Sequence, residues 1–364
     1  MSAMRTLVAA LRDPASVATL DRDAWTALVS VARAEALLAT LAHRVEGQPV
    51  PPEVEPTLAA ARRDAAQAQV AALWEAEMAR RALAPLGIEP ILLKGTAYAA
   101  AGLPNAAGRQ IGDLDILVPR DRLDSVEAAL LEAGWEWVKD DPYDQSYYRR
   151  WMHELPPLIH KTRDRMIDVH HTILPLTARV RPDSAAMIND AHALPLPQSF
   201  VNLYEPEDYP EVPADPSVVP PVAGCRVLGR FDIVHHCVAH LMADGELDGG
   251  LRNLWDFHCL VREMERRTNG KYVKDLLGDT GRHGLHHPFA RTARLAHHLF
   301  GPLMYVREPL TLADRLFLRR LLARDDWGKP TRPLTRLAFT IRGHWMRMPP
   351  LMLARHLWTK WSKR

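Results

Sequence analysis

Cysteine is scarce in this sequence, with three residues in 364: Cys225, Cys237 and Cys259. Because the number is odd and the spacing is not that of a zinc finger, we expect free thiols in a reducing compartment. Long apolar runs are also missing, since no stretch reaches the roughly 18 uninterrupted apolar residues of a membrane span. The N-terminus lacks the basic and then apolar segments of a secretory signal. We therefore expect a cytoplasmic protein that is neither secreted nor transmembrane.

An excess of charge of either sign is absent as well. The chain has 46 Lys and Arg residues against 44 Asp and Glu residues, so its formal net charge is only +2. Such a balance carries no global signature of nucleic-acid binding. With 47% hydrophobic and 25% charged residues, the composition is that of an ordinary globular protein, long enough for two or three domains.

The first 87 residues are predicted to be mostly helical. Between Leu20 and Arg44, apolar residues recur at three- and four-residue steps, which indicates an amphipathic helix. After a Pro-rich break, an Ala-rich helix is expected from Thr57 to Leu86. Gly87, which follows it, is a residue favoured just past a helix end.

A small α/β unit with mixed strand directions is expected over residues 88–173. The apolar run at 158–160, the polar turn at 161–165 and the β-branched run at 166–173 indicate a hairpin. The other predicted elements are strands at 88–93, 111–118 and 135–138, a turn at 94–96, and helices at 97–101 and 120–134.

Prolines crowd the next segment, so we expect a long loop or linker there rather than regular structure. Helical periodicity returns at Phe231 and continues through the C-terminal part. The predicted class is therefore α+β, with a small mixed-sheet core flanked by N-terminal helices and a C-terminal helical domain. The predicted segments are 1–87, 88–175, 176–225 and 226–364.

The stretch GRQIGDLDILV at 108–118 places two carboxylates in an otherwise apolar strand. Side chains at i and i+2 of a strand share a face, so Asp113 and Asp115 are expected side by side. Asp168 lies in the second arm of the hairpin, between the apolar Ile167 and Val169. Three carboxylates on neighbouring strands suit Mg²⁺, and two such ions can clamp the reacting oxygens of a phosphoryl transfer.

Upstream of these carboxylates, Lys94-Gly95-Thr96 lies where a strand passes into a helix. Backbone N–H groups and the helix dipole attract phosphate at such a turn. Gly95 allows the backbone to approach a triphosphate closely, and Thr96 adds a hydroxyl donor. Arg109 offers a fixed cation that can pair with a phosphate oxygen.

Each of these features also has a plainer interpretation. Asp168 can be an ion-pair partner of Arg163 or Arg165 across the turn, and the Lys-Gly pair can be an ordinary turn. Arg252 and Asp256, four residues apart on a predicted helix, either line a nucleotide cleft or pair with each other. The order of the motifs, each in a suitable local context, is what favours a metal and phosphate site.

Three stretches resemble a poorly characterised nucleotidyltransferase family within the DNA polymerase beta-like superfamily: LLKGTAYAAAGLPNAAGRQIGDLDILV, MHELPPLIHKTRDRMIDVHHTI and DIVHHCVAHLMADGELDGGLRNLWDFHCLV. The superfamily pattern is a Gly-Ser turn, a D-x-D strand and a later acidic residue. Here it corresponds to Gly95-Thr96, Asp113 with Asp115, and Asp168, with Thr96 in place of the commoner serine. The Lys-Gly turn, the arginine before the aspartates and Asp-Val-His resemble features of this particular family. The resemblance covers roughly residues 85–260.

The resemblance implies an enzyme that moves a nucleoside monophosphate from a nucleoside triphosphate (NTP) to an acceptor hydroxyl, with release of pyrophosphate. Asp113 and Asp115 would hold two Mg²⁺ or Mn²⁺ ions, and Asp168 would hold the catalytic one and accept the hydroxyl proton. The nucleotide-binding residues that it implies are Lys94, Gly95, Thr96, Arg109 and His170. The acceptor, whether a small molecule, a protein or an RNA, is not identified by these residues, and neither are the base of the NTP and the oligomeric state.

Other histidines have open interpretations. His153-Glu154 is not a zinc-protease motif, because the second histidine of H-E-x-x-H is missing and prolines follow. His236 and His240, four residues apart on a predicted helix, can hold zinc with Asp244 as a third ligand. More often such a pair packs inside a helical domain.

The C-terminal end is strongly basic. Beyond Asp326 there are nine Lys or Arg residues and no acidic ones, and residues 350–364 interleave Leu and Trp with basic residues. Such a helix can lie on an anionic membrane surface or contact RNA, or it can be a solvated last helix whose tryptophans pack on the domain. Two alternative functions follow: a catalytically idle nucleotide-binding regulatory module, and a membrane-peripheral assembly factor acting through this helix.

Overall fold

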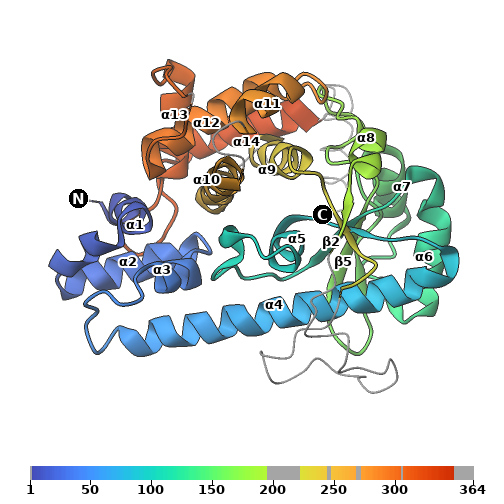
Figure 1. Cartoon of the computed structure of the whole chain (residues 1–364), viewed down its shortest axis with the longest axis horizontal. Coiled ribbons are helices and arrows are strands. Elements are labelled where there is room, and N and C mark those ends of the chain that lie inside the picture. The colour runs from blue at the N-terminus through green and yellow to red at the C-terminus, as the bar shows by residue number, and fades with distance from the viewer. Residues whose placement is uncertain (1, 195–221, 244–246, 268–271, 305, 348–364) are drawn as a thin grey trace.

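The computed structural model describes residues 2–194, 222–243, 247–267, 272–304 and 306–347. A mixed sheet of seven short strands, in the order β3-β4-β5-β2-β1-β7-β6, carries the predicted carboxylates. The strands are β1 (Ile91–Leu92), β2 (Leu114–Leu117), β3 (Trp135–Trp137), β4 (Leu158–His160), β5 (Met166–His170), β6 (His192–Ala193) and β7 (Arg226–Val227). Helices from both ends of the chain flank this sheet (Figure 1), which confirms the α+β class.

The two strands that carry the predicted carboxylates run parallel and side by side. Their register places Asp115 of β2 opposite Asp168 of β5. β4 pairs with β5 antiparallel, which confirms the predicted hairpin. β1 is antiparallel to β2 and parallel to β7, so the strand directions are mixed as expected. The strands are shorter than the apolar runs that predicted them, although Leu93 and Val118 at the ends of two runs still donate backbone hydrogen bonds to Asp115 and His170.

The N-terminal part is helical, as predicted, but the single helix expected over residues 20–44 is wrong. Two helices occupy that stretch, α2 (Arg22–Ala34) and α3 (Leu38–Arg44), after α1 (Ala3–Arg12). Ala36 lies between them with φ of 54°, a left-handed conformation that ends the helical path. Apolar periodicity alone did not reveal this break, because Leu37 beyond it is still buried.

The long helix α4 (Glu55–Leu83) runs beside the sheet and connects it to the N-terminal helices (Figure 1). It contacts α5 (Lys94–Ala100), α6 (Leu123–Glu132) and β2. Near its C-terminal end, the buried Glu75 accepts hydrogen bonds from Nε and Nη2 of Arg163, at 2.6 and 3.0 Å. A buried carboxylate is tolerated when it is paired in this way, so the ion pair fixes α4 to the turn between β4 and β5.

The segment expected to be a loop or linker contains regular structure. After α7 (Pro142–Trp151) and β5, the chain forms α8 (Ser184–Asn189) and then β6. The side chain of Asp183 accepts the amide hydrogen of Ala186 at 2.9 Å and so caps α8. The proline content of the segment concealed this helix start. Residues 195–221 of the expected linker lie outside the described residues, and the four predicted segment boundaries stay predictions.

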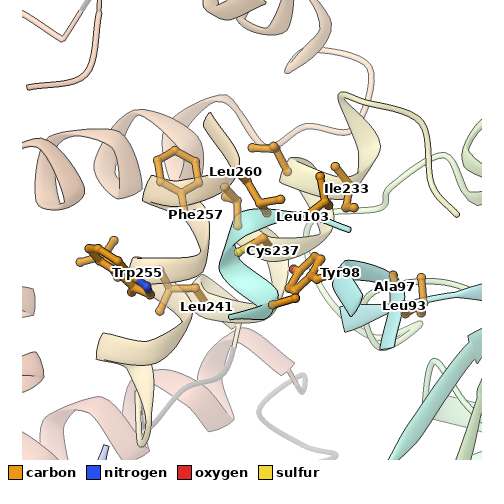
Figure 2. Packing of buried hydrophobic residues seen from close by; sticks show 14 of the residues in the cluster. Leu93, Ala97, Tyr98, Leu103, Ile233, Cys237, Leu241, Trp255, Phe257 and Leu260 are labelled. Atoms are coloured by element: carbon orange, nitrogen blue, oxygen red, sulfur yellow. The ribbon is translucent and has the colours of Figure 1, made fainter. Parts of the chain in front are cut away.

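The C-terminal part is helical, as predicted. Its helices are α9 (Asp232–Ala243), α10 (Gly250–Arg267), α11 (Tyr272–Asp279), α12 (His286–Phe300), α13 (Leu312–Leu321) and α14 (Pro333–Arg347). They pack on the sheet unit through α5, and Figure 2 shows Tyr98 of α5 close to Cys237 of α9. These residues belong to one hydrophobic core that also includes Trp25 of α2. In the described part of the chain, no helix combines the length and the apolar character needed to cross a bilayer.

A buried histidine in this core makes stability depend on pH. The ring of His258 in α10 lies 5.8 Å from the ring of Trp255 and 5.6 Å from that of Phe300. Burial first, and then the charges of Arg262 and Arg44, lower the pKa of His258 to about 4. An unfolded chain has a histidine pKa of about 6.5, so the unfolded state binds more protons between these two values. The free energy of unfolding therefore falls as the pH drops through that window.

We expect His258→Phe to reduce this acid sensitivity. The variant keeps an aromatic ring in the cluster and removes the titrating group. Urea denaturation should show that acidification from pH ~6.5 to pH ~4 costs the variant about 2–3 kcal/mol less than the wild type. The matched control is His287→Phe at an exposed position, which should titrate as the wild type does. An unchanged pH profile in His258→Phe would contradict the assignment.

Candidate active site

The three predicted carboxylates lie together at one end of the central strands. Asp115 is in β2, Asp168 is opposite it in β5, and Asp113 immediately precedes β2. Their carboxylate oxygens lie within 4.8 Å of one another, with Asp113 exposed, Asp168 half-buried and Asp115 buried. Leu114 and Ile116 point into the core on the other face of the strand. The structure thus brings the predicted carboxylates into one cluster.

Asp115 is kept ionised by two partners on the same oxygen. Nζ of Lys94 donates to its Oδ1 at 2.6 Å, and Nε2 of His170 lies 2.9 Å from the same atom. Burial by itself raises the pKa of a carboxyl, but the charges and hydrogen bonds of Lys94 and His170 outweigh it. The pKa of Asp115 is therefore held well below its usual range.

Asp168 is in the opposite situation, because nothing among the described residues neutralises it. Its Oδ1 is buried and has no hydrogen-bond partner there. Burial first, and then the charges of Asp115 and Glu154, raise the pKa of Asp168 to about 7. The plainer interpretation as an ion pair is not seen, since Arg163 binds Glu75 and Arg165 donates to the carbonyl of Gly112 at 3.5 Å. A half-buried carboxylate whose buried oxygen has no partner among the described residues, beside two other carboxylates, fits an oxygen-ligated divalent cation.

The Lys94-Gly95-Thr96 turn forms the start of α5, which contacts β2. Lys94 has φ of 48°, an uncommon conformation for a lysine, and its side chain reaches Asp115 from there. A Cβ on Gly95 would lie 2.7 Å from Nε of Arg109 and 3.0 Å from Cγ1 of Ile111. The hydroxyl of Thr96 is buried and has no partner among the described residues. Close packing is therefore one physical reason for the glycine.

Arg109 lies against this turn and is engaged elsewhere. Its guanidinium pairs with Asp256 of α10 and lies over the ring of Tyr98, 5.4 Å from the centroid. Arg252 is also paired with Asp256, at 3.2 Å, which favours the interpretation that these two helix residues bind each other. The structure therefore links Arg109 to the helical domain and not to the carboxylate cluster.

His153 and Glu154, which the sequence excluded only as a zinc-protease motif, lie next to His170. Glu154 forms an antiparallel bridge with His170, and its Oε2 is 3.5 Å from both the His170 and the His153 Nε2 atoms. Burial raises the pKa of Glu154, while the His170 and Lys94 charges oppose the rise. Because Pro156 and Pro157 follow, the sequence did not predict a strand here. Only the bridge to His170 of β5 shows that Glu154 lies at the site.

His236 and His240 of α9 also face this region from the helical domain. Burial first, and then the His240 and Lys94 charges, lower the pKa of His236 well below its usual value. Burial and Lys94 lower the pKa of His240 to about 3, and Nδ1 of that ring lies 3.3 Å from Nδ2 of Asn253. Asp244, the predicted third zinc ligand, lies outside the described residues. Within the described chain, neither histidine belongs to a group of three close metal-ligating atoms.

A cluster of carboxylates on adjacent strands of a small mixed sheet, with a Lys-Gly turn against it, is the arrangement expected of a nucleotidyltransferase. A family model described as "Uncharacterised nucleotidyltransferase" matches residues 21–301. The chain therefore belongs to this family, which confirms the resemblance drawn from its motifs. No curated protein and no solved structure matches the chain.

We expect Gly95→Ala to destabilise the protein by displacing the Arg109 side chain. Because Arg109 is tied to Asp256, it cannot move away freely, and overpacking of this kind costs about 1–3 kcal/mol. Urea denaturation measures the change in free energy of unfolding. Gly112→Ala is the matched control, since a Cβ there meets nothing within 4 Å. Equal stability of the two variants would show that the contact with Arg109 imposes no constraint.

Proposed function

We propose that this nucleotidyltransferase joins the nucleoside monophosphate of an NTP to an acceptor hydroxyl and releases pyrophosphate. The observation that carries the proposal is the register of β2 and β5, which sets the paired Asp115 opposite the unpartnered Asp168. Such a site has a net negative charge, which a divalent cation that also binds a phosphate would neutralise. Family membership supports the reaction class, and the site supports the details below.

The three carboxylates have different roles in this proposal. Asp113 and Asp115 hold Mg²⁺ or Mn²⁺, and Asp168 shares in holding one ion. When bound, the ions supply positive charge to the phosphate oxygens and to the attacking hydroxyl. Asp168 lies in the same cluster, where its carboxylate can accept the proton of that hydroxyl. A bond forms from the acceptor oxygen to the α-phosphorus, and the bond from that phosphorus to the pyrophosphate oxygen breaks.

The nucleotide is bound on the side of the Lys94 turn. Lys94 contributes a cation next to Asp115, and Gly95 and Thr96 present the backbone and hydroxyl of the turn to the triphosphate. His170 lies two residues after Asp168 in β5 and so shares its face of the strand. Its ring contacts Asp115, and in this proposal it also contacts a phosphate or the acceptor. Arg109 acts on this turn through its contact with Gly95, a role that its pairing with Asp256 supports.

The acceptor is a small molecule, a protein or an RNA, because pocket shape and not the motif selects it. A catalytically idle nucleotide-binding module is the alternative. An idle member of such a family would be expected to have lost a carboxylate, whereas all three are present and clustered in this chain. The two possibilities differ in one measurement, since both bind NTP with Mg²⁺ and only the enzyme transfers the α-phosphate.

We expect transfer of label from α-³²P NTP to an acceptor in a cell extract to depend on the three carboxylates. Asp113→Asn, Asp115→Asn and Asp168→Asn should each lower the initial rate by about 100-fold or more, equivalent to about 2.7 kcal/mol of transition-state stabilisation. Asp121→Asn, an exposed carboxylate in the same core, is the control and should keep the wild-type rate.

Circular dichroism and urea denaturation should show that the variants remain folded. Transfer by Asp113→Asn and Asp115→Asn at the wild-type rate would exclude the mechanism. If the protein binds NTP in the presence of Mg²⁺ but forms no labelled product with any of the NTPs and extracts tested, the idle nucleotide-binding module is favoured.

A second, membrane-peripheral role is favoured by α14. Four apolar side chains at helical spacing are exposed there: Leu334 at 81%, Leu337 at 55%, Ile341 at 60% and Trp345 at 50%. Basic residues flank this stripe, and no acidic residue follows Asp326 in the sequence. An exposed apolar stripe on a helix whose charged residues are all basic is complementary to an anionic bilayer surface. The contact predicted for residues 350–364 lies outside the described residues.

We expect the full chain to co-sediment with phosphatidylserine-containing vesicles and to bind them more weakly at high salt. Leu337→Glu should reduce binding by several-fold, because it places a charge in the apolar stripe. Thr335→Glu is the control, since it adds the same charge to α14 at a position outside the stripe. An equal reduction by both variants would point to charge alone, and absence of binding by the wild type would exclude the membrane contact.

A further inference from the structure

We propose that Asp232, His235 and Asp279 bind a first-row divalent metal ion such as Zn²⁺, at a structural site separate from the catalytic carboxylates. Asp232 and His235 lie on the first two turns of α9, and Asp279 is the last residue of α11. His283, in the connection to α12, joins them in one group whose candidate ligand atoms all lie within 4.8 Å of one another.

The spacing of the three ligand atoms fits a shared metal ion better than hydrogen bonds. Nδ1 of His235 is 3.7 Å from Oδ1 of Asp232 and 3.6 Å from Oδ2 of Asp279. These separations are too long for hydrogen bonds. Two ligands bound to one tetrahedral zinc ion at about 2.0–2.1 Å lie roughly 3.3 Å apart, so small shifts bring all three into the coordination range.

His235 gives independent support for a ligand. Its side chain is fully buried, and neither ring nitrogen has a hydrogen-bond partner among the described residues. A buried imidazole that faces two carboxylates without bonding to either is costly, since buried polar groups are normally satisfied. A metal ion bound to Nδ1 would use this nitrogen and neutralise the two carboxylates together.

His283 does not bind the metal in this proposal but orients Asp232, which does. Nδ1 of His283 accepts the amide hydrogen of Asp183 at 3.2 Å, so the proton of the neutral ring is on Nε2. That nitrogen is 2.8 Å from Oδ1 of Asp232, to which it donates. A ring held in this tautomer has no free lone pair for the metal, but it orients the carboxylate that does. Hydrogen bonds to ligating side chains are a common feature of protein metal sites.

The donor set indicates which metals fit. An imidazole nitrogen together with carboxylate oxygens suits zinc and neighbouring transition metals, whereas magnesium prefers oxygen ligands alone. The ion would fasten α9 to α11, and His283 extends the connection through Asp183, which caps α8. Since α9 also carries His236 beside the catalytic region, the metal would stabilise the placement of that helix.

Zinc content per chain, measured by mass spectrometry after equilibration with Zn²⁺ and excess Mg²⁺, tests this proposal in the full chain. We expect about one zinc ion in the wild type. Affinity should fall by more than about 100-fold in His235→Ala and Asp279→Asn, and by about 10–100-fold in His283→Ala. His287→Ala, an exposed histidine at the start of α12, is the matched control and should bind zinc as the wild type does.

Two further measurements guard against misfolding and against binding elsewhere. X-ray absorption of the zinc-loaded wild type requires no variant and should show nitrogen and oxygen ligands with one imidazole. Asp113→Asn combined with Asp115→Asn should leave the zinc content unchanged. Sulfur ligation, loss of zinc in this double variant, or wild-type affinity in His235→Ala would overturn the proposal. Loss of zinc in His283→Ala as complete as in His235→Ala would overturn the outer role of His283.

Discussion

The need to keep Asp115 ionised inside a sheet is the constraint on which the site depends. Its side chain is 3% exposed, and a carboxyl group in such surroundings would by itself take up a proton. Lys94 and His170 prevent this by meeting the same carboxylate oxygen from two sides. The backbone follows from this requirement: α5 begins at Lys94 with a left-handed residue, and β5 pairs in the register that brings His170 to β2.

The same neighbours leave Asp168 uncompensated. It faces Asp115 across a parallel strand pair, and Lys94 and His170 are both engaged on Asp115. The pKa of Asp168 is therefore raised by burial and by its anionic neighbours, whereas that of Asp115 is lowered. One sheet thus holds a carboxylate with its charge balanced and another that forms no ion pair among the described residues. This asymmetry is what the proposed metal site rests on.

The parts of the site that could be predicted from sequence are those encoded locally. The spacing of Asp113 and Asp115 in an apolar run, and of Asp168 in a hairpin arm, follows from strand periodicity, and the structure brings the three together. Long-range partners had no such signal. Arg109 meets Asp256, 147 positions away, because α10 packs on the short turn η3 (Pro104–Ala106) that precedes Arg109. Two-residue strands such as β6 and β7 are also too short for any periodicity, so only their pairing defines them: β7 pairs with β1, and β6 pairs with β7.

The helical domain contributes to the site through the protonation of its histidines. His236 and His240 are buried on α9, and their lowered pKa values keep both rings neutral at physiological pH. Neutral rings exclude water without adding positive charge, so α9 does not neutralise the negative charge of the carboxylate cluster. If these histidines were charged, they would compete with a divalent cation for Asp115 and Asp168. Burial of these two rings therefore preserves the negative potential of the carboxylate cluster, which the proposed reaction would use to bind its cations.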